Sequence, residues 1–253
     1  MKLFFSSSSG KEKIPKNLNI TQKNIFGNSE NQAVVFQNLR IAVITACIST
    51  ENTEVIINPS NSSLSRTTGI SHAVVNKGGK KLIAECNQII QNYGQIEPGN
   101  AIISSAGDLH CKKVIHAVVP SIFQNSQEAE LFLRSVIFNS LKLCDLYYYK
   151  SISIPIMSSG NMVGFSKEKS ALIIFNAVIE YILNNSTNIK HIRFTNLDKS
   201  ISEVFTNLLL NFQKRYVEVL ASQRMQQQKI IPRYRISLES NSSNSSDRNS
   251  YEQ

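Results

Sequence analysis

The chain has 253 residues, of which 42% are hydrophobic and 18% charged, and its formal net charge is +9. This length and composition suit one or two ordinary globular domains and exclude a chain that is disordered throughout. The positive charge favours anionic partners such as nucleotides, polyphosphates, nucleic acid or acidic proteins, although a basic surface with no dedicated partner explains it equally well.

Several classes of protein are not expected. The four cysteines, Cys47, Cys86, Cys111 and Cys144, lack CxxC spacing, so we predict neither a zinc site nor a disulfide framework, but reduced thiols in an intracellular protein. The apolar stretch at the N-terminus is too short for a signal peptide, and no apolar run reaches the ~18 residues of a membrane span. We therefore expect a soluble protein of the cytoplasm, the nucleus or both, with no membrane partner.

The first part of the chain alternates between strand-like and helix-like segments. Residues 1–30 are rich in Ser, Lys and Asn and are expected to be flexible. Strands are predicted over 33–37, 39–45 and 55–57, the last ending at an Asn-Pro pair. A helix over 71–77 should break at Gly78-Gly79, and a second helix over 81–92 places Leu82, Cys86, Ile89 and Ile90 near one face.

The alternation continues to about residue 210. Strands are predicted over 101–104, 113–118, 151–156 and 189–194, and helices over 128–147, 167–184 and 201–210. Residues 212–228 suit the end of a helix that runs into a Gln-rich basic extension, and a Ser/Asn-rich tail from about residue 231 is expected to be disordered. Strands alternating with helices predict an α/β fold with a mainly parallel sheet and helices on both faces.

Three segments are candidates for ligand binding, because ligands bind beyond the carboxyl ends of the strands in such sheets. Asn58–Asn61 offers amide donors and acceptors that suit a ribose diol. Arg66–Ser71 places a glycine before a helix, where backbone N–H groups can approach a phosphate. Ser158–Phe165 contains two glycines and two hydroxyls that can form a second nest for phosphate oxygens. Each segment, taken alone, is better explained as an ordinary turn or helix cap.

The order of these segments resembles the macrodomain signature. An apolar strand over 55–57 leads into Asn58–Asn61, then Gly69–Val74, then Gly78-Gly79, and the segments 98–101, 105–107, 114–120 and 153–165 are similar to later parts of the family. The resemblance covers about residues 35–213 and is closest to the macrodomains of multi-macrodomain ADP-ribosyltransferases. It implies a three-layer α/β/α fold with a mixed, mainly parallel sheet over 31–215, flanked by segments 1–30 and 216–253. It also implies ADP-ribose as the ligand, with no cofactor and no metal.

The resemblance also implies roles for particular residues. The second Asn of the family's N-A-A-N motif contacts the distal ribose, which assigns that role to Asn61, while Asn58 is expected to order the loop. Cys47 and Ile48 fall on the adenine side of the site. The candidate ligand-binding residues are Cys47, Ile48, Asn58, Asn61, Thr68, Gly69, Ile70, Ser71, Ser158, Ser159, Gly160, Asn161, Met162 and Phe165.

The sequence departs from the family pattern in both halves of the predicted site. Cys47 stands where the family often has an Asp that accepts a hydrogen bond from adenine, and a thiol is a poor acceptor. Losing a hydrogen bond to a charged group costs roughly 1.5 to 3 kcal/mol. Arg66, Thr67 and Thr68 stand where glycines are usual, so side chains narrow the approach to the phosphates. Arg66 can in turn contribute a charged contact to the diphosphate.

The sequence leaves three functions to compare. The main prediction is a non-catalytic module that binds ADP-ribose or mono-ADP-ribosylated proteins. The first alternative is an ADP-ribosyl hydrolase, but the Asp that hydrolytic members often use is Ser71 here, and the adjacent His72 is expected to be a surface residue. The second alternative is a degenerate macrodomain that binds proteins or RNA, although no Lys/Arg run of five or more provides a nucleic-acid motif.

Overall fold

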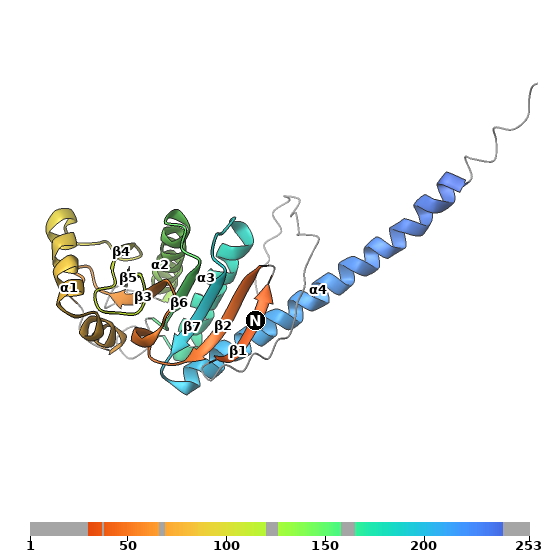
Figure 1. Cartoon of the computed structure of the whole chain (residues 1–253). Helices are drawn as coiled ribbons and strands as arrows, with labels where there is room; N and C mark the ends of the chain where they lie inside the picture. The colour runs from red at the N-terminus through yellow and green to blue at the C-terminus, as the bar shows by residue number, and fades with distance from the viewer. Residues whose placement is uncertain (1–29, 37, 66–68, 120–125, 158–164, 240–253) are drawn as a thin grey trace, which may run out of the picture. The chain divides into compact units, whose positions relative to one another are not determined.

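The computed structural model describes residues 30–36, 38–65, 69–119, 126–157 and 165–239, and for residues 30, 31, 126 and 220–239 it describes the backbone alone (Figure 1). The strands are β1 (Glu30–Phe36), β2 (Leu39–Thr45), β3 (Val55–Ser60), β4 (Ala101–Ser105), β5 (Lys113–Val118), β6 (Ser151–Ile154) and β7 (His191–Asn196). The helices are η1 (Ile48–Thr50), α1 (Gly69–Tyr93), α2 (Ser126–Leu146), α3 (Lys167–Asn184) and α4 (Lys199–Glu239).

The strands form one mixed sheet in the order β1-β2-β7-β6-β3-β5-β4. The five inner strands, β2, β7, β6, β3 and β5, are parallel to one another, whereas β1 and β4 pair antiparallel at the two edges. This arrangement confirms the predicted α/β fold with a mixed, mainly parallel sheet. Because five strands run in one direction, their carboxyl ends meet at one edge of the sheet and their amino ends at the other (Figure 1).

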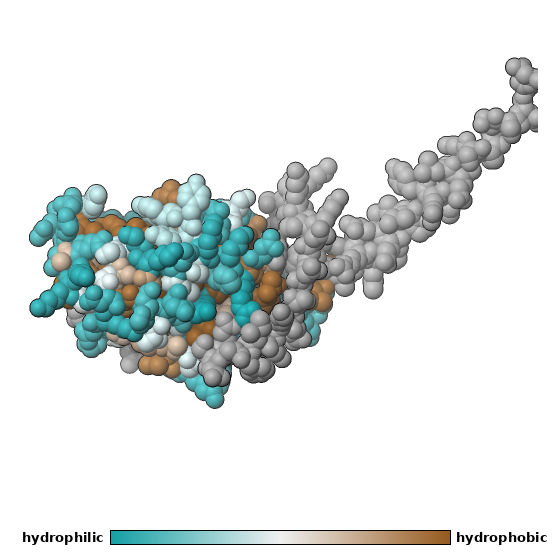
Figure 2. Space-filling model, in the orientation of Figure 1, coloured by the Kyte–Doolittle hydropathy of each residue, from teal (hydrophilic) through white to brown (hydrophobic). Residues whose placement is uncertain are grey.

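Apolar side chains pack against both faces of the sheet. On one face, Phe194 of β7 stacks on Phe205 of α4 with 4.6 Å between ring centroids, and Phe175 of α3 lies 5.6 Å from the same ring. On the other face, Leu82 of α1 packs into a cluster that includes Ile56 of β3. The predicted α/β/α layering therefore arises because alternate residues along the strands are apolar toward opposite sides. The outer surface in the view of Figure 2 is largely hydrophilic.

Two features of α1, its break and its apolar stripe, follow the prediction. The helix runs from Gly69 to Tyr93, but Gly79 has φ 68° and ψ −165°, which is not a helical conformation. The Gly78-Gly79 break was therefore correctly expected. Of the apolar stripe, Leu82, Cys86 and Ile89 are buried, and Ile90 packs against the same cluster.

The predicted end of the strand at residue 57 is wrong, because β3 continues through Asn58 and Pro59 to Ser60. All three residues pair with β5, in register with His116, Ala117 and Val118. The carbonyl of Ser60 accepts a hydrogen bond from the Val119 N–H at 3.1 Å, so Ser60 faces β5 and Pro59 faces the opposite side. Pairing with β6 is described only at Val55 and Ile56, so the missing N–H of Pro59 removes no ladder bond.

The described chain divides into two compact units between Thr206 and Asn207, inside α4. The helix continues to Glu239, so the expected loss of ordered structure near residue 231 is wrong for residues 231–239. Arg233, Arg235, Leu238 and Glu239 of this stretch are good helix formers, whereas Pro232 is a poor one, so local propensity explains the continuation only in part. The predicted domain limits at residues 30 and 215 remain predictions. Within the described residues, no helix is both long and apolar enough to cross a membrane.

Candidate functional site

Buried polar atoms without partners concentrate at the carboxyl edge of the sheet. Among the described residues, five buried side-chain N or O atoms lack a hydrogen-bond partner. Four of these belong to the ends of β3 and β7, namely Asn58 Oδ1, Ser60 Oγ, Thr195 Oγ1 and Asn196 Nδ2. Each such atom costs about 1 to 3 kcal/mol unless something else bonds to it. Their shared position indicates an edge where a ligand or water completes the hydrogen bonding.

Asn58 is held by a buried chain of hydrogen bonds that crosses three strands. Its Nδ2 donates to His116 Nδ1 at 3.2 Å, which leaves the proton of the neutral imidazole on Nε2. Nε2 in turn donates to Ser104 Oγ at 2.9 Å, and Ser104 Oγ donates to the Ser105 carbonyl at 2.9 Å. Burial lowers the pKa of His116 to about 4, so the imidazole is neutral at physiological pH. Asn58, expected to order the loop, is anchored to β5 and, through His116, to β4, and it presents Oδ1 without a partner.

Asn61, the first residue after β3, closes the turn that follows the strand. Its Oδ1 accepts from the Ser65 N–H at 2.9 Å, its Nδ2 donates to Ser65 Oγ at 3.3 Å, and its carbonyl accepts from the Leu64 N–H at 2.9 Å. These bonds fix the conformation of the turn over residues 61–65. The predicted contact of Asn61 with a ribose would replace or share the bonds to Ser65.

The start of α1 is open on its solvent side. Gly69 has φ +59°, and a Cβ added there would meet no atom within 4 Å. Ile70 packs against the apolar cluster under the helix, and Ser71 is buried. An exposed glycine at the start of a helix, where backbone N–H groups and the positive end of the helix dipole point outward, suits the approach of a phosphate. Thr68, the remaining predicted residue of this loop, lies outside the described residues, as do Arg66 and Thr67.

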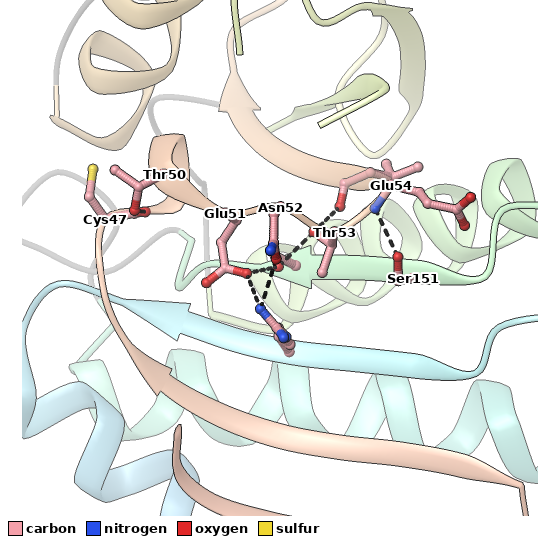
Figure 3. Close-up of polar contacts among 10 residues, drawn as sticks. Cys47, Thr50, Glu51, Asn52, Thr53, Glu54 and Ser151 are labelled. Atoms are coloured by element: carbon pink, nitrogen blue, oxygen red, sulfur yellow. Dashed lines mark hydrogen bonds and ion pairs between the residues drawn. The ribbon is translucent and has the colours of Figure 1, made fainter. Parts of the chain in front are cut away.

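The predicted adenine side consists of Cys47 and Ile48 at the end of β2. Cys47 is half-buried, and its Sγ lies 3.2 Å from Ser49 Oγ. The Cys47 carbonyl accepts a bond from Thr50 Oγ1 at 2.8 Å, which stabilises the short helix η1 (Figure 3). Ile48 is only 4% exposed and belongs to the apolar cluster on the α1 face, so most of its side chain packs inside the protein.

A buried ion pair fixes the segment that joins η1 to β3 (Figure 3). Glu51 Oε2 accepts hydrogen bonds from Arg193 Nη1 at 2.9 Å and from Ser153 Oγ at 3.0 Å. Thr53 Oγ1 lies 2.9 Å from the same Ser153 hydroxyl. These contacts tie the segment to β6 and β7, and so they hold η1, with Cys47 before it, at the carboxyl edge.

The second predicted phosphate loop leaves the sheet at the same edge. Ile156, just after β6, donates its N–H to Asn196 Oδ1 at 2.8 Å, and Met157 is buried. Phe165 is also buried, and Lys169 Nζ lies 4.5 Å from the centroid of its ring. The rest of the prediction for this loop, Ser158, Ser159, Gly160, Asn161 and Met162, lies outside the described residues.

The structure therefore brings most of the described candidates to one edge. Asn58 and Asn61 belong to β3 and its following turn, and Met157 follows β6, which is the neighbouring parallel strand. The turn after β3 and the predicted phosphate loop after β6 therefore begin side by side. Sequence reasoning missed His116, inside the apolar part of β5, and the adjacent Thr195 and Asn196 at the end of β7. The only signal for Asn196 was its position two residues after the predicted strand over 189–194, which β7 extends to Asn196.

Comparisons with known proteins show what the chain is similar to. A family model described as "Macro domain" matches residues 57–174. A Klebsiella pneumoniae (strain 342) protein named O-acetyl-ADP-ribose deacetylase is 32% identical over 170 residues, which is 67% of this chain and 96% of that protein. An uncharacterized Thermotoga maritima protein is 30% identical over 171 residues, and the match spans 67% of this chain but 28% of that protein. The structure of an Oceanobacillus iheyensis macrodomain mutant with ADPR has a TM-score of 0.67 and 22% identity, covering 72% of this chain and 98% of that one.

Proposed function

Since this chain belongs to the macro domain family, we propose that it binds ADP-ribose, free or attached to protein, at the carboxyl edge of its sheet. The observation that carries the proposal is the set of buried unpartnered atoms at the ends of β3 and β7. A ribose diol and a diphosphate supply donors and acceptors that match amide and hydroxyl groups. The macrodomain structure with ADPR supports the same ligand.

The two proposed phosphate contacts are the start of α1 and the loop after β6. Helix-start N–H groups at Gly69, Ile70 and Ser71 would donate to one phosphate, because the positive end of the helix dipole favours negative charge. Ser158, Ser159, Gly160, Asn161 and Met162 would donate to the other, with Phe165 closing the loop, and Thr68 would complete the first loop. Asn61 would bond the distal ribose, while Cys47 and Ile48 would contact adenine.

The proposal is tested by titrating the full chain with ADP-ribose in a calorimeter, with NAD and ATP as competing ligands. We expect micromolar to sub-millimolar affinity for ADP-ribose and a loss of at least about tenfold for Asn61→Ala, which corresponds to about 1.4 kcal/mol. Asn92→Ala is the matched control, because Asn92 is exposed at the far end of α1. No heat change at millimolar ADP-ribose would remove the proposal.

The identity of Cys47 gives a second, gain-of-function test of the same site. Cys47→Asp restores the charged acceptor that the family resemblance places on the adenine side. A hydrogen bond to a charged group is worth roughly 1.5 to 3 kcal/mol, so affinity should rise by about one to two decades. Unchanged or weaker binding by this variant would show that Cys47 does not face adenine.

A second candidate function is hydrolysis, which the names of relatives such as the Klebsiella pneumoniae deacetylase favour. Ester hydrolysis requires a water to add to the acyl carbonyl carbon and the bond from that carbon to the sugar oxygen to break. A base must take the water's proton, and the departing sugar oxygen must receive one. No Asp or Glu occurs from Val55 to Ala84, and His72 is exposed, with its Nε2 3.0 Å from Asn76 Nδ2. The substrate's own phosphate would then be the base. Acetate release from O-acetyl-ADP-ribose that is unchanged in His72→Ala would support this route.

Recognition of mono-ADP-ribosylated proteins, in the cytoplasm or nucleus, is the biological role that we propose for a binder without its own base. The chain should retain a mono-ADP-ribosylated protein on a column and release it when free ADP-ribose is added. Retention that free ADP-ribose does not reverse would indicate a protein contact elsewhere.

A further inference from the structure

A charged surface lies at the amino ends of the same parallel strands, at the edge opposite the proposed ADP-ribose site. Lys112, Lys113, Lys150 and Lys190 stand at or just before the first residues of β5, β6 and β7, and we call them the basic edge. Backbone hydrogen bonds hold them together: the Lys190 N–H donates to the Lys150 carbonyl at 2.7 Å, and the N–H groups of Lys112 and Lys113 donate to the Glu54 carbonyl at 2.8 and 3.1 Å.

The cations of the basic edge outnumber the nearby acids. The Glu54 carboxylate accepts hydrogen bonds from Lys112 Nζ at 2.7 Å and from the Lys150 N–H at 2.5 Å. Its negative charge is therefore paired with Lys112 and does not neutralise the other lysines. Asp145 is partly buried and accepts bonds from Tyr181, Thr187 and Asn188 inside the fold. Lys150 and Lys190 are exposed. The basic edge therefore presents positive charge to solvent, in a chain whose net charge is +9.

Exposed aromatic side chains adjoin these lysines. Leu146, Tyr147 and Tyr148 are 64%, 52% and 72% exposed, and they directly precede Tyr149 and Lys150 in the chain. The rings of Tyr147 and Tyr149 lie 6.5 Å apart. Aromatic rings next to a row of lysines are the combination that binds single-stranded nucleic acid, because bases stack on the rings while phosphates meet the cations.

The backbone of Tyr148 supplies an independent observation. Tyr148 has φ +60°, and it ends α2: its N–H donates to the Asp145 carbonyl at 3.1 Å and the next N–H donates to the Cys144 carbonyl at 2.9 Å. Helices usually place glycine at this position, because a side chain there costs about 1 kcal/mol. The same chain does so at the end of α1, where Gly94 has φ +75°. A tyrosine at the equivalent position of α2 therefore costs stability and exposes a ring to solvent.

We propose that the basic edge and Tyr148 bind single-stranded nucleic acid, with a base stacked on the Tyr148 ring and phosphates against Lys150 and Lys190. A base is favoured over an acidic peptide, because a flat base can stack on the exposed Tyr148 ring and an acidic side chain cannot. Such a contact would also explain why the ring is kept at a strained backbone position. This binding is separate from ADP-ribose binding, since the two surfaces lie at opposite edges of the sheet.

The test measures fluorescence anisotropy of a labelled ten-nucleotide oligouridylate with the full chain at several salt concentrations. Tyr148→Gly should weaken binding by roughly 5- to 150-fold, the range for losing one stacked base. Its thermal midpoint should be unchanged or higher, because glycine relieves the backbone strain. Lys150→Glu/Lys190→Glu should weaken binding and reduce the slope of log K against log salt by about 1.4.

The matched control is Lys80→Glu/Lys81→Glu, which makes the same charge change on exposed positions of α1. It should bind the oligonucleotide as the wild type does, within about twofold. Saturating ADP-ribose should not displace the oligonucleotide. Absence of binding at low salt, wild-type affinity in Tyr148→Gly, an equal loss in the control, or displacement by ADP-ribose would each overturn the proposal.

Discussion

Acid should weaken this fold through a single buried imidazole. His116 is completely buried between Asn58 and Ser104, and burial lowers its pKa from 6.5 to about 4. Below pH 6.5 the unfolded chain takes up a proton that the native chain does not take up until about pH 4. Stability is therefore lost as the pH falls between these two values and is not lost further below them. The full loss is about 3 kcal/mol, of which about 2 kcal/mol is reached by pH 5.

The measurement is urea unfolding at pH 7 and pH 5 for the wild type, His116→Gln and His110→Gln. Carboxylates that titrate in this range do so in all three proteins, so the difference in pH dependence isolates His116. We expect the loss of stability to be about 2 kcal/mol smaller in His116→Gln. His110 is exposed, so His110→Gln should keep the wild-type dependence.

The same claim can be checked without a substitution at the buried position. In the wild type, the NMR signals of the His116 ring should remain those of a neutral imidazole, protonated at Nε2, down to about pH 4. Titration of that ring near its ordinary pKa, or an equal loss of stability in the wild type and His116→Gln, would refute the argument.

Two further predictions concern packing and the buried ion pair. Gly107 has φ +59°, and a Cβ there would lie 2.0 Å from the Gly78 carbonyl, so Gly107→Ala should cost roughly 2 to 4 kcal/mol of unfolding free energy. Gly94→Ala, at a position with open space, should cost only about 1 kcal/mol in the same urea titration; equal costs would contradict the steric reason. Arg193→Met should cost about 2 to 4 kcal/mol, because it leaves the buried Glu51 carboxylate without its cation. Thermal denaturation should show that adding Glu51→Gln restores part of this loss, and no recovery would contradict the pairing.

Much of the fold follows from the periodicity of apolar residues. The limits of β2, β5 and α3 coincide with the segments predicted from the sequence, because buried strands and amphipathic helices are recognisable from local pattern. The end of β3 was missed because Asn58 and Pro59 are typical turn residues. Pairing with β5, which no local pattern reveals, extends the strand through them.

The site was predictable only where it depended on a motif. Asn58–Asn61 at the end of β3 and Gly69 at the start of α1 were identified from their order along the chain. The partners that hold or complete the edge, His116 and Asn196, come from strands that are distant in sequence and carry no motif. Identifying them requires the strand order, in which β7 lies beside β6 and β5 beside β3.

The central claim is that ADP-ribose binds at the carboxyl edge of the sheet. It is tested most directly by recording the backbone amide NMR signals of the full chain while ADP-ribose is added. The signals of Asn61, Gly69 and Ser71 should shift in proportion to saturation, and those of Tyr148 and Lys150 should not. Shifts confined to the amino-end surface, or none at millimolar ADP-ribose, would contradict the account.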